Sequence, residues 1–414
     1  MNKLLSVCFA SFLALSLAGY AFADWTRFRG PNGSGISEDK TIPMEWSATK
    51  NLQWKLDLPG KGFSSPIVVG DKVFLTCYSG SRESLKRYLV CVDRKTGKEL
   101  WTKTIPSANR EFTSAGRFAY HGYASSTPAS DGKRVYVYCG TSGVFAYDLS
   151  GKNLWQKSVG TATSTNKFGS ANSPIVYKDM VIVTAVNESS TMYAFEGTTG
   201  KLKWKAQAPN FEGCYGTPTI ANKAKGGDEL LISVAWEVWS LNPTNGKLRW
   251  FAETDVDTNA CSSVIVENDI AYLVGGKRGG RTAVKIGGRG DAKKNILWSK
   301  NGGTYVPSPV LYKGLLFWVD KRGSLVCADA KTGDEVSAKR IPGNYYASPI
   351  IVNGKLYALN RSGETYVVEA NKGLKILARN SFLGKGDFSG TPAVSDGQLF
   401  IRSSAGLYCI SQQK

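Results

Sequence analysis

The feature that most constrains this chain is a short phrase that recurs along it. Residues 93–101 read DRKTGKELW, and close versions end at Trp155, Trp204 and Trp250. Each copy sets a polar residue before a glycine turn and follows the turn with a tryptophan. The glycine permits a positive φ, and the polar side chain accepts hydrogen bonds from the turn. The phrase therefore predicts a turn, then a strand whose tryptophan packs on a neighbour and needs an acceptor for its N–H.

A second phrase, small-Ser-Pro-Ile-Val, opens each repeat. It occurs eight times, from FSSPIVV at Phe63 to FSGTPAV at Phe388, with small variations. The anchor positions are Pro66, Pro128, Pro174, Pro218, Val264, Pro309, Pro349 and Pro392. Most spacings between them are roughly 40–46 residues, the length of a four-stranded propeller blade.

These repeats predict an all-β fold, an eight-bladed β-propeller of four-stranded antiparallel blades. The eighth repeat ends at Lys414 without a fourth strand, whereas residues 51–58 (NLQWKLDL) form a fourth strand with no repeat before it. We expect this N-terminal strand to pair into the last blade and close the ring. The predicted domain is residues 24–414, with an extension at 24–50, the closing strand at 51–58 and blades from residue 63.

Six tryptophans are predicted to dock between blades. Two repeats carry alanine instead, Ala338 and Ala378, so packing there must use other residues. The predicted docking residues are Trp54, Trp101, Trp155, Trp204, Trp250 and Trp298.

The first 23 residues have the pattern of a secretory signal peptide. Lys3 precedes an apolar run, and Ala21-Phe22-Ala23 is a small-x-small cleavage site, so cleavage is predicted after Ala23. An uncleaved membrane anchor is the alternative. No later stretch is apolar and long enough to span a bilayer. We therefore expect a periplasmic or secreted protein.

The chain is strongly basic, with a formal net charge of +19. Such a field attracts anions, and the alternative is that the charge only makes the surface well solvated and soluble. For an exported chain we expect an envelope or extracellular protein, or an anionic glycan, as partner rather than nucleic acid. The cysteines leave alternatives open: Cys77 and Cys91 lie on neighbouring predicted strands and a disulfide is one option. The other is that Cys91, Cys327 and Cys409 are small buried residues at equivalent repeat positions.

The tryptophan phrase resembles the docking repeat of the pyrroloquinoline-quinone (PQQ) propellers. That superfamily includes the quinoprotein alcohol dehydrogenases and the outer-membrane assembly lipoprotein BamB. Residues 25–35 (WTRFRGPNGSG) and 121–128 (HGYASSTP) are similar to a large group of exported bacterial PQQ-like repeat proteins. The resemblance covers residues 24–414 and implies the fold. A fold does not fix a function.

In a propeller the innermost strands line a central channel, and the loops that enter it form a funnel. The predicted funnel is rich in aromatic and polar groups that suit a planar or sugar ligand. The alternative is that these side chains fill the channel and satisfy one another. The candidate ligand-binding residues are Lys61, Phe63, His121, Tyr123, Asn172, Glu212, Tyr215, Asn259, Tyr305, Tyr346 and Phe388.

The resemblance also implies a test of dehydrogenase chemistry. Quinoprotein dehydrogenases share adjacent cysteines, a calcium ion and a catalytic Asp, but this chain has no Cys-Cys pair. Glu212, Asp257 and Asn259 are oxygen donors suited to calcium. His121 is the only histidine, and no partner residue is evident from the sequence. No catalytic residue is therefore predicted.

We therefore favour a non-catalytic, BamB-like binding or assembly scaffold with an anionic envelope or extracellular partner. The alternative is a PQQ-dependent alcohol or sugar dehydrogenase that holds its ligand, PQQ with calcium, in the axial funnel.

Overall fold

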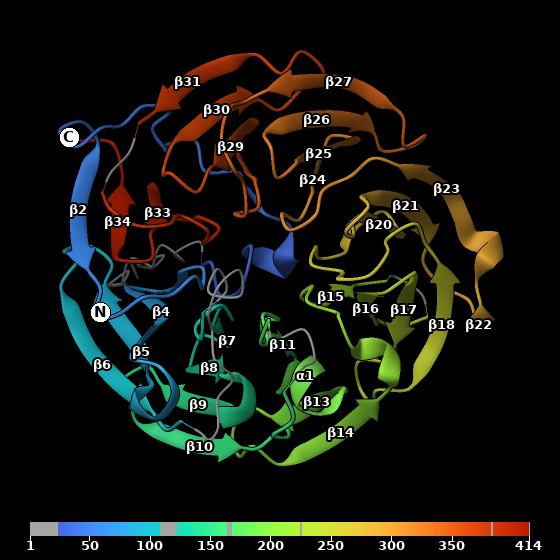
Figure 1. Ribbon diagram of the computed structural model, residues 1–414, viewed down its shortest axis with the longest axis horizontal. Helices are drawn as coiled ribbons and strands as arrows, with labels where there is room; N and C mark the ends of the chain where they lie inside the picture. The colour runs from blue at the N-terminus through green and yellow to red at the C-terminus, as the bar shows by residue number, and fades with distance from the viewer. Residues whose placement is uncertain (1–23, 108–121, 164–167, 224–225, 382–383, 414) are drawn as a thin grey trace, which may run out of the picture.

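Eight β-sheet blades surround a central axis (Figure 1). The computed structural model describes residues 24–107, 122–163, 168–223, 226–381 and 384–413. The predicted all-β, eight-bladed propeller is confirmed. The predicted signal peptide and His121 lie outside the described residues. In the described part of the chain, no helix has the length and apolarity needed to cross a membrane.

The blades follow one another around the ring in chain order. From the innermost strand outward, the first blade consists of β3 (Ile67–Val69), β4 (Lys72–Ser79), β5 (Lys86–Asp93) and β6 (Glu99–Ile105), and the second of β7 (Ala129–Ser130), β8 (Arg134–Tyr138), β9 (Val144–Asp148) and β10 (Asn153–Lys157). In the same order, the third blade consists of β11 (Ile175–Tyr177), β12 (Met180–Ala185), β13 (Thr191–Glu196) and β14 (Leu202–Gln207), and the fourth of β15 (Thr219–Ala221), β16 (Glu229–Val234), β17 (Glu237–Leu241) and β18 (Leu248–Glu253). The fifth blade consists of β19 (Ile265–Glu267), β20 (Ile270–Gly275), β21 (Gly280–Lys285) and β23 (Ile296–Asn301), and the sixth of β24 (Val310–Tyr312), β25 (Leu315–Val319), β26 (Ser324–Asp329) and β27 (Glu335–Arg340). The seventh blade consists of β28 (Ile350–Val352), β29 (Lys355–Leu359), β30 (Thr365–Glu369) and β31 (Ile376–Asn380), and the eighth of β32 (Ala393–Ser395), β33 (Gln398–Arg402), β34 (Gly406–Ile410) and β2 (Leu52–Asp57).

Short elements complete the described chain. Strand β1 (Ile36–Ser37) pairs in parallel with β28, and β22 (Gly290–Asp291) pairs in parallel with β18. The remaining short helical segments are η1 (Pro31–Gly33), η2 (Arg82–Ser84), η4 (Gly140–Ser142), α1 (Val186–Ser189), η5 (Pro209–Phe211) and η6 (Lys293–Asn295).

The burial of each strand explains its pattern of apolar and polar residues. All six residues of β12 are buried, because each blade packs between two others. The outermost strands alternate instead, and in β14 only Trp204 is fully buried. Val69 pairs with Lys72 across the two-residue turn that the sequence predicts at 70–71.

The N-terminal strand closes the ring. β2 pairs antiparallel with β34, and Trp54 lies opposite Cys409. The closure predicted from the orphan strand at 51–58 is therefore present. No seam is left open between the last blade and the first.

Five of the six tryptophans contact the next blade in the same way. Each indole N–H donates to a backbone carbonyl in that blade's turn between its third and fourth strands. The pairs are Trp54 to Arg94 (3.0 Å), Trp101 to Leu149 (3.4 Å), Trp155 to Gly197 (2.9 Å), Trp204 to Pro243 (3.0 Å) and Trp298 to Ala330 (3.1 Å). The turn glycine lies against the indole: a Cβ at Gly97 would come within 2.5 Å of the Trp54 ring. The glycine therefore serves close contact as well as positive φ.

Three blades depart from that pattern: the fourth, and the sixth and seventh, where Ala338 and Ala378 replace the tryptophan. Trp250 donates to the carboxylate of Glu229 in its own blade at 2.6 Å. In the sixth blade, where Ala338 replaces the tryptophan, Ser337 Oγ donates to Lys372 O of the next blade at 2.6 Å.

The cysteines of the described chain are free. Cys77 lies opposite Tyr88, whereas Cys91 lies opposite Phe74, so the two sulfurs are not paired across the strands. Cys91, Cys327 and Cys409 are fully buried, each opposite a phenylalanine of the second strand.

Residues 24–37 cross the axis on one face of the ring, with η1 near the centre (Figure 1). Trp25 bridges to Val68 in the first blade, and β1 pairs with the seventh blade. The hairpins between first and second strands lie on this face, which we call the rear face. The innermost strands begin at the opposite, front face.

Candidate functional site

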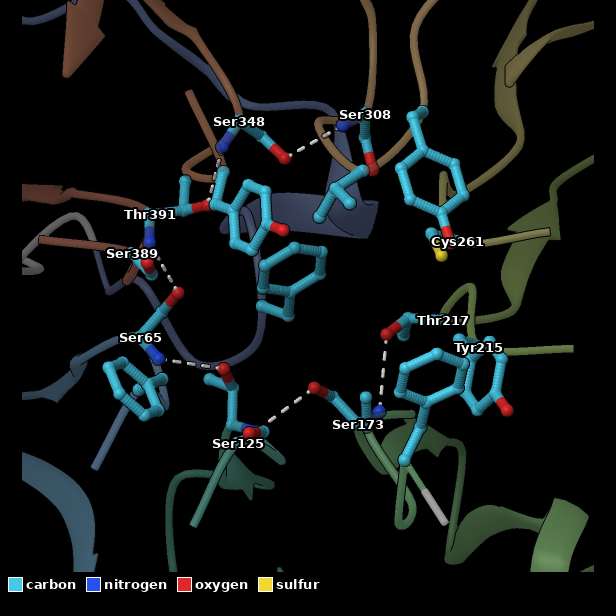
Figure 2. Close-up of a pocket in the computed structure, with 18 of the residues that line it drawn as sticks. Ser65, Ser125, Ser173, Tyr215, Thr217, Cys261, Ser308, Ser348, Ser389 and Thr391 are labelled. Atoms are coloured by element: carbon cyan, nitrogen blue, oxygen red, sulfur yellow. Dashed lines mark hydrogen bonds between the residues drawn. The ribbon is translucent and has the colours of Figure 1, made fainter. Parts of the chain in front are cut away.

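A closed ring of hydrogen bonds joins the starts of the innermost strands. In every blade the residue before the anchor position is Ser or Thr, and its hydroxyl accepts a hydrogen bond from the backbone N–H of its counterpart in the preceding blade, at 2.9–3.2 Å. We call these eight residues the hydroxyl ring: Ser65, Thr127, Ser173, Thr217, Ser263, Ser308, Ser348 and Thr391. Figure 2 labels six of them, Ser65, Ser173, Thr217, Ser308, Ser348 and Thr391. The ring holds the blades at a fixed distance from the axis and satisfies amides that no strand partner reaches.

A cavity of about 430 Å³ lies over the hydroxyl ring on the front face. Seven of the eight ring residues line it, the exception being Ser263. We call it the axial cavity (Figure 2). Its volume falls in the range of small-molecule sites, about 300–1,000 Å³. Each ring hydroxyl that accepts an amide N–H still carries one O–H donor for a ligand.

Aromatic side chains form the walls and floor of the axial cavity. The aromatic residues are Phe28, Phe63, Phe168, Tyr215, Tyr305 and Tyr346. Phe28 comes from the N-terminal segment, so the segment that crosses the rear face also supplies the cavity floor. Phe168 and Tyr215 meet edge to face at 6.1 Å between ring centroids. Such faces stack on planar or sugar groups.

The charged groups at this cavity are cations. Lys277 and Lys321 line it, and the described lining contains no Asp or Glu. Neither lysine forms an ion pair with another described residue. The Lys321 Nζ lies 5.8 Å from the centroid of the Tyr346 ring, and the Arg361 guanidinium lies 4.7 Å from the same centroid. The Arg361 charge is offset by an ion pair with Asp387.

Five predicted ligand residues line the axial cavity: Phe63, Tyr215, Asn259, Tyr305 and Tyr346. Burial raises the pKa of Tyr305 to about 12, with nearby Cys261 adding to the shift. The Tyr305 hydroxyl is therefore neutral at physiological pH and available as a hydrogen-bond donor.

The other described candidates lie elsewhere. Tyr123 packs edge-on against Tyr78 and lines a small neighbouring pocket. Lys61 and Glu212 are exposed outside the described lining of the axial cavity.

Two more candidates are buried between blades. Asn172 is fully buried and its amide donates to Cys214 O and Gly216 O of the next blade. Phe388 is fully buried and stacks on Tyr408.

The three calcium candidates do not converge. Asp257 is 3% exposed and accepts hydrogen bonds from the backbone N–H of Arg278. Glu212 is exposed, whereas Asn259 lines the cavity. In the part of the chain that the structure describes, no group of three or more His, Cys, Asp and Glu side chains is arranged to hold a metal ion.

Sequence reasoning missed several lining residues. Lys277 sits in a glycine-rich stretch that reads as a flexible turn, and Lys321 belongs to an ordinary strand connection. Phe28 lies outside the repeats. The hydroxyl ring had a usable signal, because Ser or Thr precedes the anchor position in all eight repeats.

Comparisons with known proteins agree with this architecture. The sequence model of the family described as outer membrane protein assembly factor BamB matches residues 85–339, more than half of the chain. The outer membrane protein assembly factor BamB of Burkholderia pseudomallei is 31% identical over 145 residues, which is 35% of this chain and 30% of that protein. The match therefore spans less than a third of that relative's length.

Solved structures share the fold, among them a BamB protein and a methanol dehydrogenase. BamB from Moraxella catarrhalis superposes with a TM-score of 0.63 at 13% identity, over 87% of this chain and 99% of that one. A europium-containing methanol dehydrogenase gives a TM-score of 0.68 at 12% identity, over 94% of this chain and 98% of that one. Because the family match covers most of the blades, this chain belongs to the family of the outer membrane protein assembly factor BamB.

Proposed function

We propose that this chain is an exported, non-catalytic binding scaffold of the bacterial envelope, and that it holds an anionic partner at the mouth of the axial cavity. The observation that carries the proposal is the charge of the described cavity lining, which has two lysines and no carboxylate. The family supports the scaffold role, since an assembly factor acts by binding.

The chemistry of the cavity suits a segment that is both apolar and anionic. Aromatic walls remove an apolar group from water, and the lysines at the mouth attract its charge. The hydroxyl ring supplies O–H donors at the bottom. An acidic peptide segment with an aromatic or aliphatic side chain has this character, and it is the partner chemistry we propose.

The alternative is a PQQ-dependent dehydrogenase, which the axial position of the cavity and the fold shared with a methanol dehydrogenase favour. The aromatic walls and two lysines fit a planar, anionic group. The side-chain oxygens of the described lining are hydroxyls and the amide of Asn259, and these do not fit the carboxylate-bearing set that a bound calcium needs.

Charge reversal at the mouth tests the scaffold proposal. In pull-downs from envelope extract, the double variant K277E/K321E should capture at least about tenfold less partner than the native protein does. A loss of about 1.4 kcal/mol of binding free energy corresponds to a tenfold loss of affinity. Both lysines are exposed, so the variant should fold. The matched control is K205E/K339E, which makes the same charge change on the outermost strands β14 and β27.

The outcomes separate the two functions. Loss of partner in K277E/K321E alone supports the scaffold. Equal retention by both double variants contradicts it. The protein is also incubated with PQQ and calcium. A bound-quinone spectrum together with dye-linked alcohol oxidation would instead support the dehydrogenase.

A further inference from the structure

Two arginines of the N-terminal segment are buried near the axis with no counter-ion in the described part of the chain. Arg27 is 8% exposed and Arg29 fully buried. Both donate to backbone carbonyls: Arg27 Nη2 donates to Pro218 O at 2.9 Å, and Arg29 Nη2 donates to Pro309 O and Ser34 O. No carboxylate among the described residues pairs with either.

Donors on both guanidinium groups are left without acceptors. Arg27 Nε, Arg29 Nε and Arg29 Nη1 are buried and have no hydrogen-bond partner among the residues that the structure describes. Burial lowers the pKa of Arg27 to about 10 and that of Arg29 to about 9, and the Arg27 charge adds to the second shift. Both groups therefore stay charged at neutral pH. A buried charge with no partner costs several kcal/mol.

A second cavity, of about 260 Å³, opens beside Arg27 on the rear face. We call it the rear cavity, and it is separate from the axial cavity. Its polar lining consists of Thr26, Arg27, Asn32, Ser130, Tyr177, Lys178 and Asn222, with no Asp or Glu in the described lining. It therefore combines a nearly buried guanidinium, an ammonium group and two amides.

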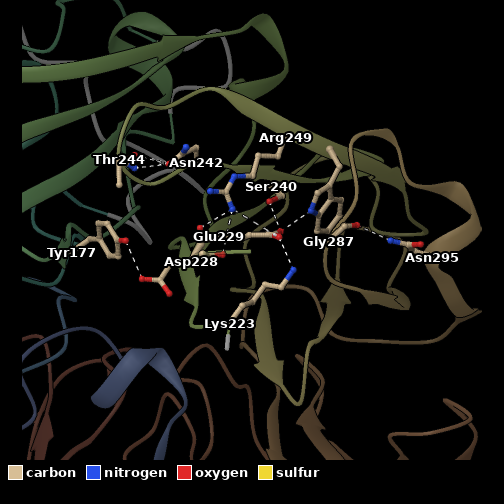
Figure 3. A network of polar contacts seen from close by, with 12 residues as sticks. Tyr177, Lys223, Asp228, Glu229, Ser240, Asn242, Thr244, Arg249, Gly287 and Asn295 are labelled. Atoms are coloured by element: carbon tan, nitrogen blue, oxygen red, sulfur yellow. Dashed lines mark hydrogen bonds and ion pairs between the residues drawn. The ribbon is translucent and has the colours of Figure 1, made fainter. Parts of the chain in front are cut away.

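The carboxylate of Asp228, which contacts the lining residue Tyr177, is already engaged. The Tyr177 hydroxyl donates to Asp228 Oδ2 at 2.9 Å, and Figure 3 shows Asp228 next to Tyr177. Asp179, beside Lys178 in the hairpin, lies 3.9 Å from Lys203 Nζ. The Lys178 ammonium lies 5.2 Å from the centroid of the Tyr177 ring and has no ion-pair partner in the described chain.

We propose that the rear cavity binds a phosphate group, free or as a terminal monoester, between the guanidinium of Arg27 and the ammonium of Lys178. Guanidinium groups match the oxygens of phosphate in geometry, and charge-assisted hydrogen bonds are the strong ones. Asn32 Nδ2 already donates one hydrogen to Ile220 O at 2.8 Å, so its second N–H and the amide of Asn222 add the donors that a simple surface lysine patch lacks. The bound anion also offsets the buried positive charge at the axis.

Calorimetry with inorganic phosphate on the full chain tests the proposal, at constant ionic strength and with chloride as the reference anion. We expect saturable binding of one phosphate per chain, with a Kd at or below the order of 1 mM. The variant K178Q should weaken binding at least about fivefold, because it removes the exposed half of the charge pair. N222L should weaken it in the same direction by a smaller factor.

The matched control is K313Q. Lys313 occupies the same hairpin position in the sixth blade, also with positive φ and with its ammonium 5.1 Å from the Tyr312 ring. K313Q should bind phosphate as the native chain does. A parallel titration with glycerol 3-phosphate identifies the source: binding of both probes supports a monoester, and binding of inorganic phosphate alone supports the free ion.

Three results would overturn the proposal. The first is the absence of saturable phosphate binding up to about 10 mM, which corresponds to a negligible affinity. The second is an equal weakening of phosphate binding in K178Q and K313Q. The third is full retention of phosphate binding in both K178Q and N222L. Thermal unfolding of the two variants checks that they fold, since both residues are exposed and should leave the midpoint unchanged.

Discussion

Replacing Trp54 by alanine is expected to lower the free energy of unfolding by about 3–5 kcal/mol, the usual cost of removing a buried Trp. Trp54 is 9% exposed, packs on Gly97 and Phe400, and donates to Arg94 O. It joins the last blade to the first, so its loss should also free the closing strand β2. Hydrogen exchange measured on peptides covering 51–58 and 406–411 should speed up under native conditions.

Trp155→Ala is the matched control, because Trp155 makes the same contact between blades that follow one another in the chain. It should lose a similar free energy of unfolding without selective exchange in β2. Unchanged exchange in the closing strand of Trp54→Ala, or equal acceleration in the two variants, would contradict this account of ring closure.

Replacing Glu229 by alanine should cost about 3–5 kcal/mol of stability, as expected when one member of a buried charge network is removed. The Glu229 side chain is 4% exposed and receives Trp250 Nε1 and Ser240 Oγ at 2.6 Å, with Lys223 Nζ at 3.1 Å (Figure 3). Its removal leaves the ammonium and the indole N–H without their acceptor.

Glu237→Ala provides the comparison. Glu237 also accepts an indole N–H, from Trp239, but it is only half-buried. Chemical denaturation of this control should show a loss of about 1 kcal/mol or less. A similar loss in both variants would mean that burial of the Glu229 network contributes nothing.

The architecture was predictable because the same repeat occurs eight times in the sequence. Pro66 and its counterparts gave the blade count, and the orphan strand around Trp54 gave the closure. These signals are local phrases with a direct physical meaning. The contact of Trp250 was not predictable in this way. Its acceptor Glu229 lies on another strand of its own blade, and no local sequence motif indicates that pairing.

The candidate site was only partly predictable. Aromatic residues next to the anchor positions, such as Tyr305 and Tyr346, line the axial cavity because the repeat places them there. Phe388 has a similar position in the sequence, but it is buried against Tyr408 because side-chain direction in a loop depends on tertiary contacts. Arg27 and Phe28 lie in a unique segment, so only the three-dimensional path across the axis reveals their roles.

Site-specific photocrosslinking tests the central claim, that the mouth of the axial cavity holds the partner. A benzoylphenylalanine is placed at Tyr346, at the cavity, or at Leu100, which is 46% exposed on an outermost strand. Irradiation in envelope extract should yield a discrete adduct from position 346, lost when K277E/K321E is added, and none from position 100. An adduct from position 100 with none from position 346 would contradict the proposed binding site.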